Sequence, residues 1–341
     1  QAVVVDAENR YRMLANCCPN VYVLGFSFGG AAALNLDVKP RPRALVLVAP
    51  ALYPRLNFAQ RILISIGLER LGHDVVYHED TWTWPYDPVR RLRSADGEYS
   101  ARFIADFFER FAPELKHRWH YLHLHETSHG MSREAFEAFA GTADVFLNVS
   151  GASALPETLA PDCMTVFVDT DPGYNQIVLS ERPDWSENVD RWAESVLQHD
   201  RHVTYAELIG HPDCRVPTVG LDWLTTRMPI VPDLWAHRAA AGPPTDAPWT
   251  TVMTWNAFGG PLLYDGLEYK SKGAEFQKII ALPGRTDARL RIALGGRDAP
   301  IQDLQAEGWE VQDGPEATLT PERYQAFLRE SRGELSTAKH V

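Results

Sequence analysis

Two short apolar runs constrain what this chain can fold into more than any other feature. They cover residues 145–149 (VFLNV) and 165–168 (TVFV), and a polar crossover separates them. Apolar runs of this length that stop abruptly at turn-forming residues are typical of strands that a parallel sheet buries on both faces. The sequence therefore predicts an α/β fold.

The residues that follow these two runs are the first candidates for a functional site. Ser150 and Gly151 follow the first run, and Asp169 and Asp171 follow the second. In an open α/β sheet, ligands bind at the carboxyl ends of the strands. We therefore expect a binding site in these two loops.

The composition limits the classes of function that the chain can have. Its 341 residues suffice for two domains of ordinary size, and its net charge is −12. An acidic surface argues against nucleic acid as a partner. The sequence shows no apolar run of about 18–20 residues and no secretory signal pattern at its start. We therefore expect a cytoplasmic protein with no membrane span.

The first 57 residues carry the sharpest local motif. A strand runs into the sequence GFSFGG, which precedes a helix of small residues and a second strand. This order resembles the nucleophile elbow of the α/β-hydrolases, in which a tight turn lifts a serine hydroxyl above the sheet. The resemblance implies Ser27 as a nucleophile with Asp298 and His340 as its partners, and thus a serine hydrolase or esterase as the alternative function. A borrowed hydrolase segment, or a glycine loop that holds phosphate, is the other interpretation of the motif.

From residue 58 onwards, a different set of segments follows in order. They are ERLGHDVVYHED, WPYDP, ADVFLNVSG, VFVDTDPGYNQI, DCRVPTVGLDWLTTRMPIV, WTTVMTWNAFG, KSKGAEF, GWEVQD and ELSTAKHV. Together they resemble a group of bacterial glycosyltransferase-like proteins with the GT-B fold, related to the glycosyltransferase 1 class. The resemblance covers residues 58–341.

This resemblance implies two Rossmann-like parallel-sheet domains and a sugar transfer from a nucleotide sugar to an acceptor. The implied domains are a hydrolase-like unit at 1–57, an acceptor-side domain at 58–235, a linker rich in Ala, Gly and Pro at 236–249, and a donor-side domain at 250–341. The donor-side domain is expected to be incomplete and the chain to be a fragment. A nucleotide sugar and an acceptor are the expected small-molecule partners, and no further cofactor is expected.

Glycosyl transfer needs a base for the acceptor hydroxyl and donors that neutralise the departing diphosphate. Asp80 and Asp171 lie at predicted strand ends and are the candidate catalytic residues. The candidate substrate-binding residues are Ser150, Gly151, Asp169, Asn256, Lys272 and His340. The alternative interpretation of the acids is that they are solvated loop carboxylates or helix caps. A lysine such as Lys272 is more often an ordinary surface residue than a ligand contact.

Five histidines lie close together in residues 117–130, and His125 and His129 form the string HETSH. This string matches the HExxH pattern that binds zinc from one face of a helix. However, Thr127, Ser128 and Gly130 favour a loop over a helix. A solvated or acceptor-facing loop is therefore the preferred interpretation, and no metal is expected.

Overall fold

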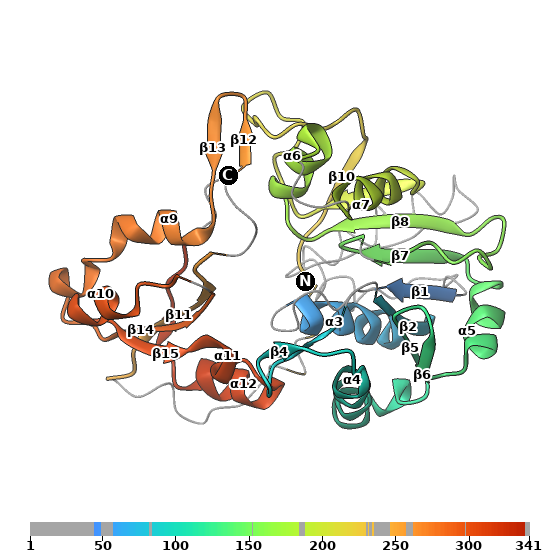
Figure 1. Ribbon diagram of the computed structural model, residues 1–341, viewed down its shortest axis with the longest axis horizontal. Coiled ribbons are helices and arrows are strands. Elements are labelled where there is room, and N and C mark those ends of the chain that lie inside the picture. Colours follow the sequence, from blue (N-terminus) through green and yellow to red (C-terminus); the bar gives the residue numbers. More distant parts are fainter. Residues whose placement is uncertain are drawn as a thin grey trace, which may run out of the picture. The chain divides into compact units, whose positions relative to one another are not determined.

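The computed structural model describes residues 44–48, 57–81, 84–151, 153–183, 188–229, 231, 234, 246–256, 262–296 and 298–337. The chain forms two compact units, residues 1–234 and residues 235–341. Both units are of the α/β class with parallel strands (Figure 1). Among the described residues, we find no helix with the length and apolar character that crossing a membrane requires.

The first unit is built on an eight-stranded sheet. In spatial order its strands are β10 (Trp223–Thr225), β9 (Arg201–Thr204), β8 (Met164–Asp169), β7 (Val145–Val149), β1 (Ala44–Val48), β2 (Asp74–Thr81), β5 (Trp119–His123) and β6 (Thr127–Gly130). All neighbours are parallel except β5 and β6, which form an antiparallel hairpin. The two apolar runs that predicted buried strands are β7 and β8, which lie side by side.

The order of the parallel strands indicates where a ligand is expected to bind. Counted along the chain, β5, β2 and β1 are the third, second and first parallel strands, and β7, β8 and β9 follow as the fourth to sixth. This is the doubly wound order 3-2-1-4-5-6, whose direction reverses between the first and fourth strands. The reversal here lies between β1 and β7, so among the described residues those just after β7 mark the expected site.

The position of β1 differs from the sequence-based domain division. The sequence pattern places residues 44–48 in a hydrolase-like unit of residues 1–57, whereas β1 pairs with both β2 and β7 at the middle of the first sheet. A short apolar strand has the same local pattern in either context, and only its pairing with distant strands decides which sheet it joins. The rest of the elbow motif, including Ser27, lies outside the described residues.

Helices cover both faces of the first sheet. They are α3 (Asn57–Arg70), α4 (Glu98–Phe111), α5 (Arg133–Ala140), α6 (Tyr174–Glu181) and α7 (Asn188–Leu197). The α5 side chain Phe136 packs in a cluster with Val76 of β2, whereas the α4 side chain Phe108 makes an edge contact with Tyr77. Consecutive residues of a strand point to opposite faces, so α5 and α4 lie on opposite sides of β2. Burial on both faces explains the continuous apolar runs in β7 and β8.

The second unit has a smaller parallel sheet. Its spatial order is β15 (Glu310–Asp313), β14 (Leu290–Gly295), β11 (Trp249–Thr254) and β16 (Gly333–Glu334). Beside it are the hairpin β12 (Leu262–Tyr264) and β13 (Leu267–Tyr269) and the helices α9 (Lys272–Phe276), α10 (Ile301–Ala306), α11 (Gly314–Ala317) and α12 (Pro321–Arg329). If β11, β14, β15 and β16 are counted as the first to fourth strands of this sheet, their spatial order is again 3-2-1-4. The core of the unit lies around Trp255, Phe276 and Trp309.

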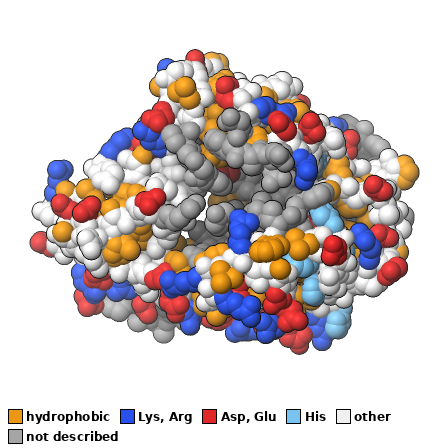
Figure 2. All heavy atoms as spheres, in the orientation of Figure 1, with side chains coloured by type: hydrophobic (Ala, Val, Ile, Leu, Met, Phe, Trp, Pro, Cys, Tyr) orange, Lys and Arg blue, Asp and Glu red, His pale blue; other side chains and the backbone are white. Residues whose placement is uncertain are grey.

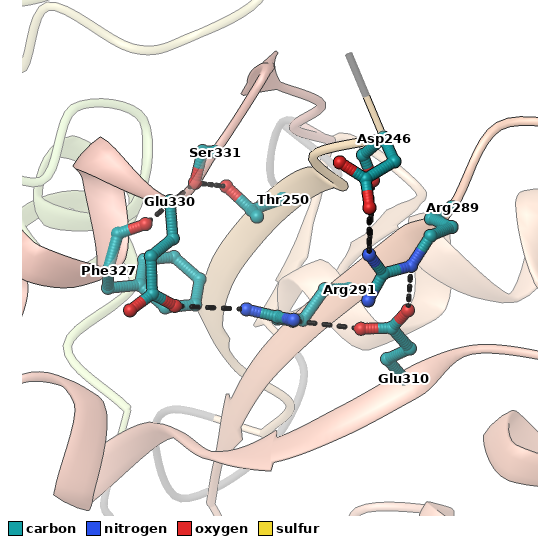
Figure 3. A network of polar contacts seen from close by, with 8 residues as sticks. All are labelled: Asp246, Thr250, Arg289, Arg291, Glu310, Phe327, Glu330 and Ser331. Carbon is teal, nitrogen blue, oxygen red and sulfur yellow. Dashed lines mark hydrogen bonds and ion pairs between the residues drawn. The ribbon is translucent and has the colours of Figure 1, made fainter. Parts of the chain in front are cut away.

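A polar network joins the amino ends of these strands (Figure 3). Glu310 accepts hydrogen bonds from Arg289 Nε at 2.7 Å and from Arg291 Nε at 3.0 Å. The Thr250 and Ser331 hydroxyl oxygens lie 2.7 Å apart, which links β11 to the segment before β16. Burial opposes ionisation of Glu310, but the two arginines lower its pKa. The amino ends of the strands in the second sheet therefore carry structural contacts.

Candidate active site

Asp80 is the acid at the end of β2, and it is almost completely buried, with 4% of its surface exposed. Its Oδ1 lies 3.2 Å from Nδ1 of His125. Burial raises the pKa of Asp80 to about 7, against the opposing effect of the Arg133 charge. At neutral pH the carboxyl group therefore exists in both protonation states, which is the property that a general acid or base requires.

His125 is held over Asp80 by an unusual turn between β5 and β6. Leu124 and His125 both have positive φ angles, 50° and 60°. Tight hairpin turns with two such residues normally use Asn-Gly or Asp-Gly, and other residues in this conformation cost about 1–2 kcal/mol each. Burial and the charges of Arg133 and Arg191 lower the pKa of His125, and its Nδ1 lies beside Asp80 Oδ1 without completing a hydrogen bond to it.

Two stacked histidines lie on β2 and β5, next to Asp80 and the turn that carries His125. His78 of β2 and His120 of β5 have ring centroids 5.0 Å apart and Nδ1 atoms 3.1 Å apart. His120 Nε2 also lies 3.0 Å from the Ser128 hydroxyl on β6, and Phe136 stacks on both rings. His78 is two residues before Asp80 and so shares its face of the strand. The pair therefore links β2 to the hairpin that carries His125.

This histidine pair predicts a loss of stability in acid. Burial lowers the pKa of His120 to about 4 and that of His78 well below its usual value. At these two imidazoles the unfolded chain therefore binds more protons than the folded one as the pH falls from about 6.5 towards 4, so the contribution of the pair to the free energy of unfolding falls over this window. For His120 the loss is on the order of 3 kcal/mol.

The prediction is checked by urea unfolding of the wild type and of His120→Phe at pH 7.5, 6, 5 and 4.5. As the pH falls from 7.5 to 4.5, the stability of His120→Phe should rise relative to that of the wild type, because one imidazole of the buried pair is gone. His211, an exposed histidine, gives a matched control as His211→Phe. Equal pH dependence in all three proteins would contradict the predicted role of the pair.

The HETSH string does not form a helical metal motif. His125 lies in the turn before β6, and His129 lies on β6 itself, where its ring stacks on Tyr121 with 5.6 Å between centroids. His123 contacts the Tyr121 hydroxyl and the Ala95 carbonyl oxygen instead of facing His125. Within the described ranges, no group of three or more His, Cys, Asp or Glu side chains is arranged to hold a metal ion.

Ser150 and Gly151 form the turn after β7. The Ser150 hydroxyl lies 2.6 Å from that of Thr170, which follows β8, and its carbonyl oxygen accepts a hydrogen bond from the indole of Trp192. Gly151 has a φ of 65°, and a Cβ atom there would lie 2.8 Å from the Phe167 ring. The turn is therefore fixed by packing on α7, and it presents the Ser150 and Thr170 hydroxyls together.

We expect Gly151→Ala to destabilise the first unit by about 2–3 kcal/mol, because the new methyl group must both accept a positive φ and displace an aromatic ring. Gly210→Ala is the matched control. Gly210 has a φ of 77° but open space where a Cβ would lie, so this variant should lose only the backbone contribution, about 1 kcal/mol. Chemical unfolding measures both, and equal losses would refute the packing argument.

Asp169 is completely buried at the end of β8, and its carboxylate holds the site together. It accepts hydrogen bonds from Asn175 Nδ2 at 2.6 Å, from Gln176 Nε2 at 2.7 Å and from the Asp171 backbone N–H at 3.0 Å. The Thr204 hydroxyl of β9 donates to its second oxygen. Burial raises the pKa of Asp169, while these four donors act in the opposite direction. Asp169 thus orders the loop that carries Thr170 and Asp171.

The two predicted catalytic acids do not form a pair. Asp80 is on β2, and Asp171 follows β8, with β1 and β7 between these strands. Three strand spacings separate their backbones by roughly 14 Å, too far for a shared proton. The two acids instead lie on either side of the ends of β1 and β7, and Asp80 combines deep burial with a pKa of about 7.

The remaining candidates lie in the second unit or outside the described residues. Asn256 is exposed just after β11, Lys272 begins α9, and Asp298 is exposed after β14 with a φ of 58°. Gly296 allows the loops after β11 and β14 to approach, since a Cβ there would lie 3.1 Å from the Trp255 nitrogen. Ser27 and His340 lie outside the described residues, so the hydrolase triad has no structural test.

Comparison with known proteins does not narrow the possible functions of the chain. The chain matches no protein-family model, no curated protein and no solved structure. The assignment of the candidate site therefore rests on the geometry of its residues alone. Two of its features were missed from the sequence: the contact between His125 and Asp80, and the pair formed by His78 and His120. The sequence contains no signal for the pair, because residues 117–130 were expected to form a loop, whereas residues 119–123 form β5 beside β2.

Proposed function

We propose that this chain is a glycosyltransferase of the GT-B type that transfers a sugar from a nucleotide sugar to an acceptor hydroxyl. The single observation that carries the proposal is that both units contain a parallel sheet with an order beginning 3-2-1-4. Two Rossmann-like units in one chain are what the resemblance from residue 58 onwards implies. The candidate base at the carboxyl edge of the first sheet adds chemical support.

In the proposed reaction, Asp80 is the general base. Its carboxylate accepts the proton of the acceptor hydroxyl as the hydroxyl oxygen attacks the anomeric carbon of the sugar. The bond from that carbon to the diphosphate oxygen breaks, and the nucleoside diphosphate leaves with the bonding electron pair. His125, whose Nδ1 lies 3.2 Å from the carboxylate, is assigned to orienting Asp80, and the Arg133 charge favours the charged form of Asp80. The Ser150 and Thr170 hydroxyls are assigned to binding the acceptor.

The donor is assigned to the carboxyl edge of the second sheet. Asn256 and Lys272 lie near the ends of its strands and supply an amide and a cation for the diphosphate. Cationic and amide donors that meet developing negative charge are the main source of catalysis in such a transfer. A nucleoside diphosphate product should therefore bind to the second unit more tightly than the free nucleoside does.

Equilibrium binding of labelled UDP- and dTDP-sugars to the full chain tests the proposal. We expect binding of at least one donor, and we expect Lys272→Ala to weaken it at least tenfold. Lys278→Ala is the matched control, because Lys278 is an exposed lysine that pairs with Glu275 at 2.7 Å. Failure of every nucleotide sugar and nucleoside diphosphate to bind, or equal effects of the two substitutions, would count against the proposed donor site.

A further inference from the structure

A small hairpin after β2 exposes several large apolar side chains. It comprises residues 84–93 and contains β3 (Tyr86–Asp87) and β4 (Leu92–Arg93). The exposed fractions of Trp84, Val89 and Leu92 are 55%, 66% and 50%. Single exposed apolar residues are ordinary, but a group of them within one short element marks an interaction surface. We call residues 84–93 the arginine hairpin.

The arginine hairpin is a rigid element. The Asp87 carboxylate is buried beneath the turn and accepts hydrogen bonds from the backbone nitrogens of Val89 and Arg90 at 2.8 and 2.9 Å. The backbone nitrogen of Ser94 donates to the Pro85 carbonyl oxygen at 3.0 Å and so closes the base. The apolar side chains are therefore held in solvent by a fixed backbone, which lowers the entropy that binding would cost.

Its charge is opposite to that of the whole chain. Residues 84–93 contain three arginines and one aspartate, a formal charge of +2, whereas the chain carries −12. Arg90, Arg91 and Arg93 are all exposed. Arg90 also lies 3.5 Å from Asp87 and 3.8 Å from Asp96, and Arg93 donates to the Trp84 carbonyl oxygen at 3.5 Å. Hydrophobic and basic side chains lie beside one another over the region where Figure 1 places β4 (Figure 2). The surface thus combines apolar and cationic groups.

We propose that the arginine hairpin docks the protein on an anionic lipid bilayer. Tryptophan favours the interface between lipid and water, and Val89 and Leu92 on the same rigid hairpin can enter the headgroup region beside it. Arginines close to the surface attract anionic headgroups. The acidic remainder of the chain is repelled by such a surface, so binding should occur through this hairpin. This proposal is independent of the sugar-transfer chemistry.

The test is flotation of the full chain with vesicles of phosphatidylcholine alone and of phosphatidylcholine with 30% phosphatidylglycerol, in about 50 mM salt. We expect binding to the anionic vesicles only, reduced at least tenfold in about 500 mM salt because the attraction is screened. Replacing Arg90, Arg91 and Arg93 by glutamine should reduce binding by a similar factor, as should replacing Trp84, Val89 and Leu92 by serine.

The matched control replaces two other exposed leucines, Leu208 and Leu263, by serine and should bind like the wild type. Circular dichroism and gel filtration establish that each variant is folded. The proposal is overturned if the wild type does not float with anionic vesicles, or if the control and hairpin variants bind equally. Concentration-dependent dimerisation that the hairpin serines abolish, without vesicle binding, would assign the surface to a second copy and also overturn it.

Discussion

Replacing Asp80 by asparagine is expected to lower the rate of sugar transfer by about 10²- to 10⁴-fold, the usual contribution of a general base. The carboxylate form of Asp80 accepts the proton in the proposed reaction, and burial raises the pKa of this group to about 7. The rate of the wild type should therefore rise with pH up to about 7 and then level off. Release of nucleoside diphosphate from a labelled donor, in the presence of a set of hydroxyl acceptors, measures both effects.

The same substitution should make the protein more stable in alkaline solution. Because the pKa of Asp80 is raised from 3.8 to about 7, the folded state binds more protons than the unfolded state between these values, and stability falls as the pH rises through them. An uncharged asparagine removes this cost, so Asp80→Asn should gain up to about 4 kcal/mol at pH 8. A gain in stability together with a loss of activity is typical of a catalytic group.

Two further measurements separate this role from a general structural one. Carbon-13 NMR of labelled aspartate should show one carboxyl group that titrates near pH 7 and that disappears in Asp80→Asn. Asp106→Asn, at an exposed position of α4, is the matched control and should change neither activity nor stability. Unchanged activity in Asp80→Asn, with the NMR titration absent from the wild type, would remove Asp80 from the proposed mechanism.

Local patterns were sufficient to predict the strands that flank the site. The apolar runs at 145–149 and 165–168 became β7 and β8 because burial on both faces leaves a signal in the residues themselves. The sequence also placed Asp80 at a strand end, and the structure has it near the end of β2. The place of β1 could not be predicted in this way, since its partners β2 and β7 begin 30 and about 100 residues later.

Two properties of the site had no signal in the sequence. The turn that brings His125 to Asp80 uses Leu124 and His125 at positive φ, where glycine or asparagine is the expected residue. The role of Asp169 was also unpredictable, because Thr204, one of its donors, lies 35 residues away and meets it only through the register of β8 and β9. Strand-end position marks an acid as a candidate, but only the structure shows whether its oxygens are already used.

Asp169→Ala is expected to cost the first unit about 3–5 kcal/mol of unfolding free energy, the range for removing one partner from a buried charged network. The substitution leaves the amides of Asn175 and Gln176, the Thr204 hydroxyl and one backbone N–H without their acceptor. Each buried donor that loses its partner costs about 1–3 kcal/mol when water cannot replace it. The loop that carries Thr170 and Asp171 should loosen as a result.

The isosteric variant Asp169→Asn sharpens this prediction. Asparagine keeps one oxygen for Asn175 and for the Asp171 backbone, but it turns an NH₂ group towards the Gln176 amide. We therefore expect an intermediate loss of about 1–3 kcal/mol. Asp213→Ala removes an almost fully exposed carboxylate and should stay within about 0.5 kcal/mol of the wild type. Urea unfolding, followed by tryptophan fluorescence, compares the stability of Asp169→Ala, Asp169→Asn and Asp213→Ala. If both Asp169 variants were as stable as Asp213→Ala, the Asp169 network would not be formed in solution.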